Sequence, residues 1–94
     1  MSVPETQSMA QVFINKLLKK LDKQLEGKKV EGSSGNGAVR IVISGQFRVL
    51  GVKISPRLSC NYEQLEKYVA AAVDDALQKG SELLRSEAQK ILSS

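Results

Sequence analysis

Several residue types are scarce in this 94-residue chain, and each shortage excludes a class of function. The chain has no histidine, no tryptophan, one cysteine, two prolines and only four aromatic residues. Without histidine and with a single thiol, it cannot assemble a conventional zinc site or a Cys-His or Ser-His catalytic pair. The composition therefore argues against an enzyme, and we expect no catalytic residue, metal, cofactor or small-molecule substrate.

The same shortages indicate where the protein works. One cysteine, Cys60, excludes an internal disulfide and fits a reducing cytoplasm, with a structural role or incidental crosslinking of a dimer favoured over catalysis. The first residues include Glu5 and Pro4 where a signal peptide has basic and then apolar residues. No apolar run approaches the ~20 residues that span a bilayer. We therefore expect a cytoplasmic protein without a membrane segment.

Charge is distributed unevenly along the chain. The net charge is +4, but residues 1–58 hold 10 basic and 4 acidic residues (+6), whereas residues 59–94 hold 4 basic and 6 acidic residues (−2). A basic first half favours a polyanionic partner, and a solvated lysine face is the competing interpretation.

Residues 30–56 carry the only strand chemistry in the chain. The runs Ala38–Ser44 and Arg48–Ile54 are rich in Val and Ile and lie between glycines, and Lys28–Gly32 is a weaker first strand. Alternation predicts an apolar face formed by Val39, Ile41 and Ile43, and another formed by Leu50, Val52 and Ile54, opposite Val49 and Lys53. We predict a three-stranded antiparallel meander over residues 28–55, with a flexible loop at 33–37 and a tight turn in which Gly45 has a positive φ. The loop glycines precede a strand, so they do not form a phosphate-binding loop.

A helix is predicted before the sheet, over about residues 3–26. Ser2 and Glu5 have the spacing of a capping box, with Thr6 as an alternative start, and Gly27 lies where a C-terminal cap belongs. One face is an apolar stripe, and the opposite face presents a row of lysines spaced three and four apart: Lys16, Lys19, Lys20 and Lys23.

A longer helix is predicted after the sheet, over about residues 61–92, with Asn61 and Gln64 as an N-cap pair. The predicted fold class is therefore α+β, a helix followed by a meander and a long second helix. Adjacent Asp74 and Asp75 point apart on it and are interpreted as part of a solvated face. Such a helix is ~46 Å long, whereas a seven-residue strand spans ~23 Å. Its distal apolar residues must therefore pack on the first helix or on another chain, which favours a dimer.

Three pieces of sequence resemble the YbaB/EbfC family of bacterial nucleoid-associated proteins. They are the glycine-rich stretch 32–37 leading into alternating Val and Ile, the Ile54-x-Pro56 strand end, and Leu65-x-x-x-Val69-Ala70-Ala71-Ala72 followed by Asp75-Ala76. The resemblance covers about residues 17–92. It implies a nucleoid protein that forms a homodimer through its sheets, with projecting paired helices that bind DNA. The chain has a more Lys- and Leu-rich first helix than usual and lacks the Pro/Met-rich tail common in the family.

Nucleic-acid binding is the function that these observations favour. Lysines serve as point charges for phosphates, and four scattered aromatics give no stacking platform for single strands, so we expect binding to double-stranded DNA with little sequence preference. The expected contacts are Lys16, Lys19, Lys20 and Lys23, assisted by Lys79 and Arg85 if the second helix lies beside the first. Arg40 and Lys53 are expected on the outer sheet face, with a dimer interface as the alternative. The alternative function is a dimeric protein-interaction module.

Overall fold

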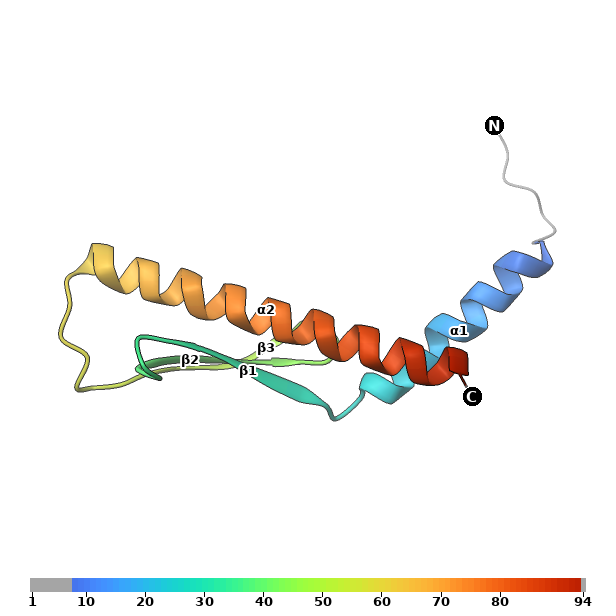
Figure 1. Cartoon of the computed structure of the whole chain (residues 1–94), viewed down its shortest axis with the longest axis horizontal. Helices are drawn as coiled ribbons and strands as arrows, with labels where there is room; N and C mark the ends of the chain where they lie inside the picture. Colours follow the sequence, from blue (N-terminus) through green and yellow to red (C-terminus); the bar gives the residue numbers. More distant parts are fainter. Residues whose placement is uncertain (1–7, 94) are drawn as a thin grey trace, which may run out of the picture.

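The fold, seen in a computed structural model that describes residues 8–93, is one long helix laid over a small sheet with a second helix at one end (Figure 1). The elements follow in the order α1 (Met9–Leu25), β1 (Lys29–Ser34), β2 (Val39–Ser44), β3 (Val49–Ile54) and α2 (Tyr62–Ser93). This order confirms the predicted α+β class and the helix–meander–helix arrangement. Among residues 8–93, no helix combines the length and the apolar character needed to cross a bilayer.

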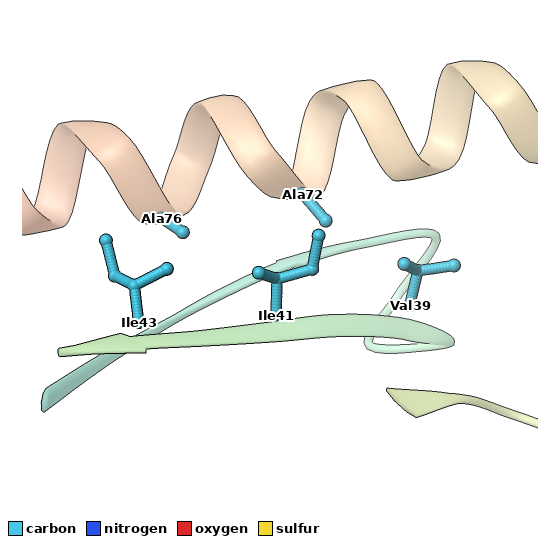
Figure 2. Close-up of a cluster of buried hydrophobic side chains, with 5 residues drawn as sticks. All are labelled: Val39, Ile41, Ile43, Ala72 and Ala76. Carbon is cyan, nitrogen blue, oxygen red and sulfur yellow. The ribbon is translucent and has the colours of Figure 1, made fainter. Parts of the chain in front are cut away.

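The sheet is an antiparallel meander in the order β1-β2-β3, and α2 covers only part of it. Val39, Ile41 and Ile43 of β2 point from the sheet towards Ala72 and Ala76 of α2, and all five side chains are buried (Figure 2). The apolar face predicted for this strand is therefore confirmed. The helix packs along β1 and β2 and leaves β3 uncovered.

Small residues allow α2 to lie against the sheet. Gly32 of β1 is buried where a methyl group would overlap the backbone nitrogen of Ala76 and the backbone oxygen of Ala72. Gly80 likewise meets Ile43 and the ring of Phe47, whose carbons would lie 3.1 and 3.0 Å from an added Cβ. Close contact therefore explains a glycine in mid-helix, where it costs ~1 kcal/mol relative to alanine.

Helix α2 begins where its capping residues predict. The Gln64 backbone N–H donates to Asn61 Oδ1 (2.8 Å), and the Asn61 N–H donates to Gln64 Oε1 (3.2 Å), so the two side chains satisfy each other's backbone groups. At the other end the helix extends beyond the sheet, and its last turns share an apolar groove with α1. The length of the predicted helix relative to the strands implies such a contact, with α1 or with another chain. The groove is lined by Leu17, Leu18, Leu21, Ala88, Ile91 and Leu92.

Helix α1 begins at Met9 among the described residues. Ser8 is its N-cap, since the Ser8 hydroxyl accepts from the backbone N–H of Gln11 at 3.1 Å. The proposed capping box of Ser2 and Glu5, and the alternative Thr6, lie outside the described residues. The helix ends at Leu25, and Gly27 has a φ of +75°, which agrees with its predicted place at the C-terminal end.

Two local predictions in the sheet are wrong. Gly45 does not have a positive φ; Phe47 does (+63°), and Gly45 is required because an added Cβ would lie 2.8 Å from the Leu25 backbone oxygen. In β3, a bulge at Leu50 shifts the register so that Ile43 faces Val49. Val49 therefore shares the α2 side with Val52 and Ile54 instead of lying opposite them. The first strand also extends to Ser34, two residues beyond the predicted end.

Candidate nucleic-acid interface

The four lysines predicted on the first helix form a continuous exposed row on α1. Lys16, Lys19, Lys20 and Lys23 line a shallow hollow of about 460 Å³ whose apolar floor is Phe13 and Leu17. Within residues 8–93 none of these lysines forms an ion pair. Like charges on one helix face repel each other, so a bound polyanion lowers the electrostatic energy of this surface.

The fold holds this helix away from the body. Only Leu17, Leu21 and Leu25 of its apolar stripe are buried or half-buried, and all three lie in its C-terminal part. Met9, Val12, Phe13 and Ile14 are exposed. In Figure 1, α1 crosses the end of α2 and extends beyond it. The lysine row is thus accessible to a partner as large as a nucleic-acid duplex.

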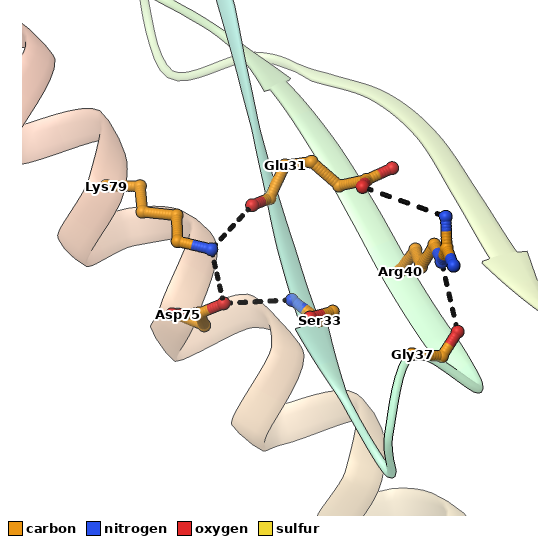
Figure 3. Close-up of polar contacts among 6 residues, drawn as sticks. All are labelled: Glu31, Ser33, Gly37, Arg40, Asp75 and Lys79. Atoms are coloured by element: carbon orange, nitrogen blue, oxygen red, sulfur yellow. Dashed lines mark hydrogen bonds and ion pairs between the residues drawn. The ribbon is translucent and has the colours of Figure 1, made fainter.

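Lys79 has a different environment from the lysine row. Its ammonium group lies 3.1 Å from Asp75 Oδ2 and donates to the Glu31 backbone oxygen at 3.2 Å (Figure 3). The same Asp75 carboxylate accepts from the Ser33 N–H at 3.0 Å. This backbone donor, and then Lys79, hold the pKa of Asp75 below its ordinary value. Lys79 therefore joins α2 to the exposed edge of β1.

Arg85 is exposed on α2, on the side turned away from the sheet. At about 100° per residue, Lys79 projects on one flank of α2, whereas Ala88 and Ile91, which contact α1, project on the opposite side. The structure thus keeps the four lysines of α1 together and places Lys79 on the far flank of the second helix. Helix α2 lies beside α1 only through its distal turns, and the contacts of Lys79 and Arg85 with DNA stay predictions.

Arg40 and Lys53 occupy the outer face of the sheet, where they are paired directly across β2 and β3. The Arg40 Nε–H donates to the Gly37 backbone oxygen at 3.1 Å, and its guanidinium lies 4.0 Å from Glu31 (Figure 3). Lys53 has no ion-pair partner among residues 8–93. Glu31 and Val42 share this outer face with Arg40 and Lys53, whereas Val49, Val52 and Ile54 of β3 lie towards the other side.

One charged residue that the sequence reasoning did not single out is central to the fold. Glu87 is 3% exposed, and its Oε2 accepts from Lys28 Nζ at 2.8 Å and from Lys90 Nζ at 3.1 Å. Lys28, and then Lys90, hold the pKa of Glu87 below its ordinary value. The signal was present in the sequence, because Glu87 follows Gly80 by seven residues and so lies within the apolar stripe of α2.

These features define a small α+β protein that presents an unpaired cationic helix. Among residues 8–93 no group of three or more His, Cys, Asp or Glu side chains is arranged to hold a metal ion. The surface is suited to electrostatic contact with a polyanion, which is the property shared by proteins that contact the nucleic-acid backbone.

Comparison with known proteins identifies the family of this chain. Residues 5–94 match the model of the YbaB/EbfC DNA-binding family, and the chain belongs to this family. It is 38% identical over 76 residues to a nucleoid-associated protein of Caldanaerobacter subterraneus subsp. tengcongensis, covering 79% of this chain and 68% of that one. It is 33% identical over 95 residues to a nucleoid-associated protein of Alkaliphilus oremlandii, covering 88% and 83%.

A solved structure shares the fold. The crystal structure of an uncharacterized protein from Helicobacter pylori superposes with a TM-score of 0.74 at 18% identity, covering 87% of this chain and 98% of that one. The family and the fold identified from the sequence are thus both confirmed. The chain is a nucleoid-associated, DNA-binding protein by family.

Proposed function

We propose that the protein binds double-stranded DNA on the bacterial nucleoid through the phosphate backbone, with α1 as the contact surface. The observation that carries this proposal is the exposed row of Lys16, Lys19, Lys20 and Lys23, which has no carboxylate partner within residues 8–93. Each phosphate neutralised by a lysine releases condensed counterions, and this release favours binding whatever the base sequence.

The chemistry of α1 favours low sequence preference. Base edges in the major groove are read mainly by Arg, Asn and Gln, which make bidentate hydrogen bonds. Helix α1 contains no Arg, and its Gln11 amide donates to Asn15 Oδ1 at 3.2 Å, which occupies two of its polar side chains. We infer that the helix positions the protein on the duplex without reading bases.

We also propose that the protein is a homodimer joined at β3. This edge strand exposes apolar residues along its length: Val49 is 65% exposed, Leu50 59%, Val52 53% and Ile54 46%. Val73 and Leu77 extend the apolar surface onto the neighbouring flank of α2. A long apolar edge strand pairs readily with another strand, and antiparallel pairing with the same strand of a second copy would cover the surface of both chains.

A salt series tests DNA binding directly. Fluorescence anisotropy would be measured on a duplex of arbitrary sequence with wild type and with a variant in which Lys16, Lys19, Lys20 and Lys23 are changed to Gln. We expect the logarithm of the association constant to fall linearly with the logarithm of salt concentration, with a slope of about −0.9 per phosphate contact. The quadruple variant should bind more weakly and with a shallower slope.

A matched control replaces the exposed Lys29, Lys53, Arg57 and Lys67 with Gln, which removes the same charge from outside α1 and leaves the contacts of Glu87 intact. This control should keep most of the salt slope of wild type. Equal losses in both variants would contradict α1 as the contact surface. Salt-independent behaviour, or no binding by wild type at low salt, would instead favour the alternative function, a protein-interaction module that uses the exposed apolar residues of α1 and β3.

A further inference from the structure

The buried carboxylate of Glu87 and the junction between α1 and β1 form one connected unit. Glu87 lies on α2, six residues before the helix ends at Ser93, and faces Lys28. Lys28 follows Gly27, the residue with positive φ at which the chain turns from α1 into the sheet. The 2.8 Å contact between Lys28 Nζ and Glu87 Oε2 therefore joins α2 to the point from which α1 departs.

The backbone of the same junction is fixed from another side. The Gly45 N–H donates to the Lys28 backbone oxygen at 2.8 Å, and the Lys28 N–H donates to the Leu25 backbone oxygen at 3.2 Å. Gly45 also lies against Leu25, the one residue of α1 that is buried. The turn between β2 and β3 holds the backbone of Lys28, and Glu87 holds its side chain.

Apart from the junction, α1 is held by a hydrogen bond from the Gln46 side-chain amide to Asp22 Oδ1 at 2.8 Å and by the apolar groove shared with α2, both in its C-terminal part. On the N-terminal side of Leu17, every residue of α1 is exposed except the half-buried Asn15, and the groove that α1 shares with Ala88, Ile91 and Leu92 has an open space of about 160 Å³. A helix held through its last two turns moves as a lever, so a small rotation at Lys28 displaces Lys16 by more than it displaces Lys23. The junction thus governs where the lysine row lies.

We propose that Glu87 is a positioning residue for DNA binding, because its contact with Lys28 sets the direction of α1 and so aligns the lysine row with the rest of the molecule. The proposal rests on the proposed function of α1. Lys90 contacts the same carboxylate from the same helix, so it neutralises the buried charge without joining two elements. These two lysines keep Glu87 ionised at neutral pH, so the contact between Lys28 and Glu87 persists throughout the physiological pH range.

Lys28→Gln and Lys90→Gln form a matched pair of variants for the test. Each removes one positive charge from the same carboxylate, but only Lys28→Gln releases the junction. Spin labels would be placed at Gln11→Cys on α1 and Gln78→Cys on α2 in a Cys60→Ser background, with labelled protein diluted into unlabelled protein. We expect a broader distance distribution in Lys28→Gln than in Lys90→Gln, and duplex affinity about fivefold lower.

A second pair of variants tests the carboxylate itself. Glu87→Gln and the exposed Glu82→Gln both raise the net charge by one, which by itself favours phosphate binding. We expect Glu87→Gln to weaken binding and broaden the distances, and Glu82→Gln to do neither. If Glu87→Gln fails to fold, the comparison of Lys28→Gln with Lys90→Gln tests the proposal without it. Equal distance distributions in Lys28→Gln and Lys90→Gln would overturn the proposal, whereas absence of duplex binding by wild type would overturn the proposed function.

Discussion

At the scale of single residues, the contact between sheet and helix depends on Gly32. Its missing side chain lets the backbone of β1 approach the backbone of α2 at Ala72 and Ala76. Backbone atoms cannot swing aside as the end of a flexible side chain can, so a methyl group here must push the two elements apart. The buried cluster of Val39, Ile41 and Ile43 lies beneath the same two alanines and would lose contact with them.

We therefore expect Gly32→Ala to lower the free energy of unfolding by about 3 kcal/mol, the upper part of the range for overpacked cores. Gly51 on β3 is the control, because an added Cβ there meets nothing within 4 Å. Gly51→Ala should change stability by less than about 1 kcal/mol. Urea denaturation followed by circular dichroism measures both. Equal effects of the two substitutions would contradict the close-approach explanation.

The two carboxylates with lowered pKa values determine how stability responds to acid. Asp75 and Glu87 bind protons more weakly in the folded than in the unfolded chain, so the unfolded state takes up more protons as pH falls. We expect the free energy of unfolding to be constant near neutrality and to decrease below about pH 4.5. Denaturant titrations between neutral and acidic pH should show a shallower decrease in Asp75→Asn than in Asp74→Asn, whose carboxylate contacts only Gln78. An equal decrease in the free energy of unfolding at acidic pH in the two variants would contradict the role of Asp75.

At the scale of elements, the sequence predicted what local chemistry determines. Asn61 and Gln64 placed the start of α2 because capping is a matter of neighbouring backbone groups. The alternation of Val39, Ile41 and Ile43 placed the buried face of β2 because β2 itself alternates regularly, and the extra residue of the bulge lies in β3. The lysine row of α1 followed from helical spacing in the same way, and its contact with DNA stays a prediction.

Tertiary contacts account for what the sequence could not predict. A bulge at Leu50 changes which side of the sheet Val49 occupies, and simple alternation contains no sign of it. The positive φ falls on Phe47, whose ring packs beside Gly80 of α2, and the glycine at position 45 is instead required by the close approach of Leu25. The contacts of Lys79 with Asp75 and Glu31 depend on how α2 packs on β1, which the sequence alone does not show, and its contact with DNA stays a prediction.

At the scale of the whole molecule, the exposed face of β3 predicts self-association. Val52 lies on the apolar side of this strand, opposite Ile41, and Lys53 lies on the polar side, opposite Arg40. We expect wild type and Lys53→Glu to be dimers and Val52→Glu to be a monomer, because a carboxylate cannot be buried unpaired between two apolar strands. Size-exclusion chromatography with light scattering distinguishes these states. A monomeric wild type, or a dimeric Val52→Glu, would contradict the β3 interface.

Helix α2 is a single uninterrupted helix that serves two separate partners, the sheet through Ala72 and Ala76 and the α1 junction through Glu87 and Ala88. The rotation about the helix axis between the residues that face the sheet and those that face the α1 junction is therefore fixed. One residue inserted between Gly80 and Glu87 would turn the distal half by about 100° and remove Glu87 from Lys28, while the sheet-covering half stayed in place. The loop of residues 35–38 carries no such constraint and accepts a change of length. During divergence of this fold, insertions and deletions should accumulate in the loops and spare the middle of α2.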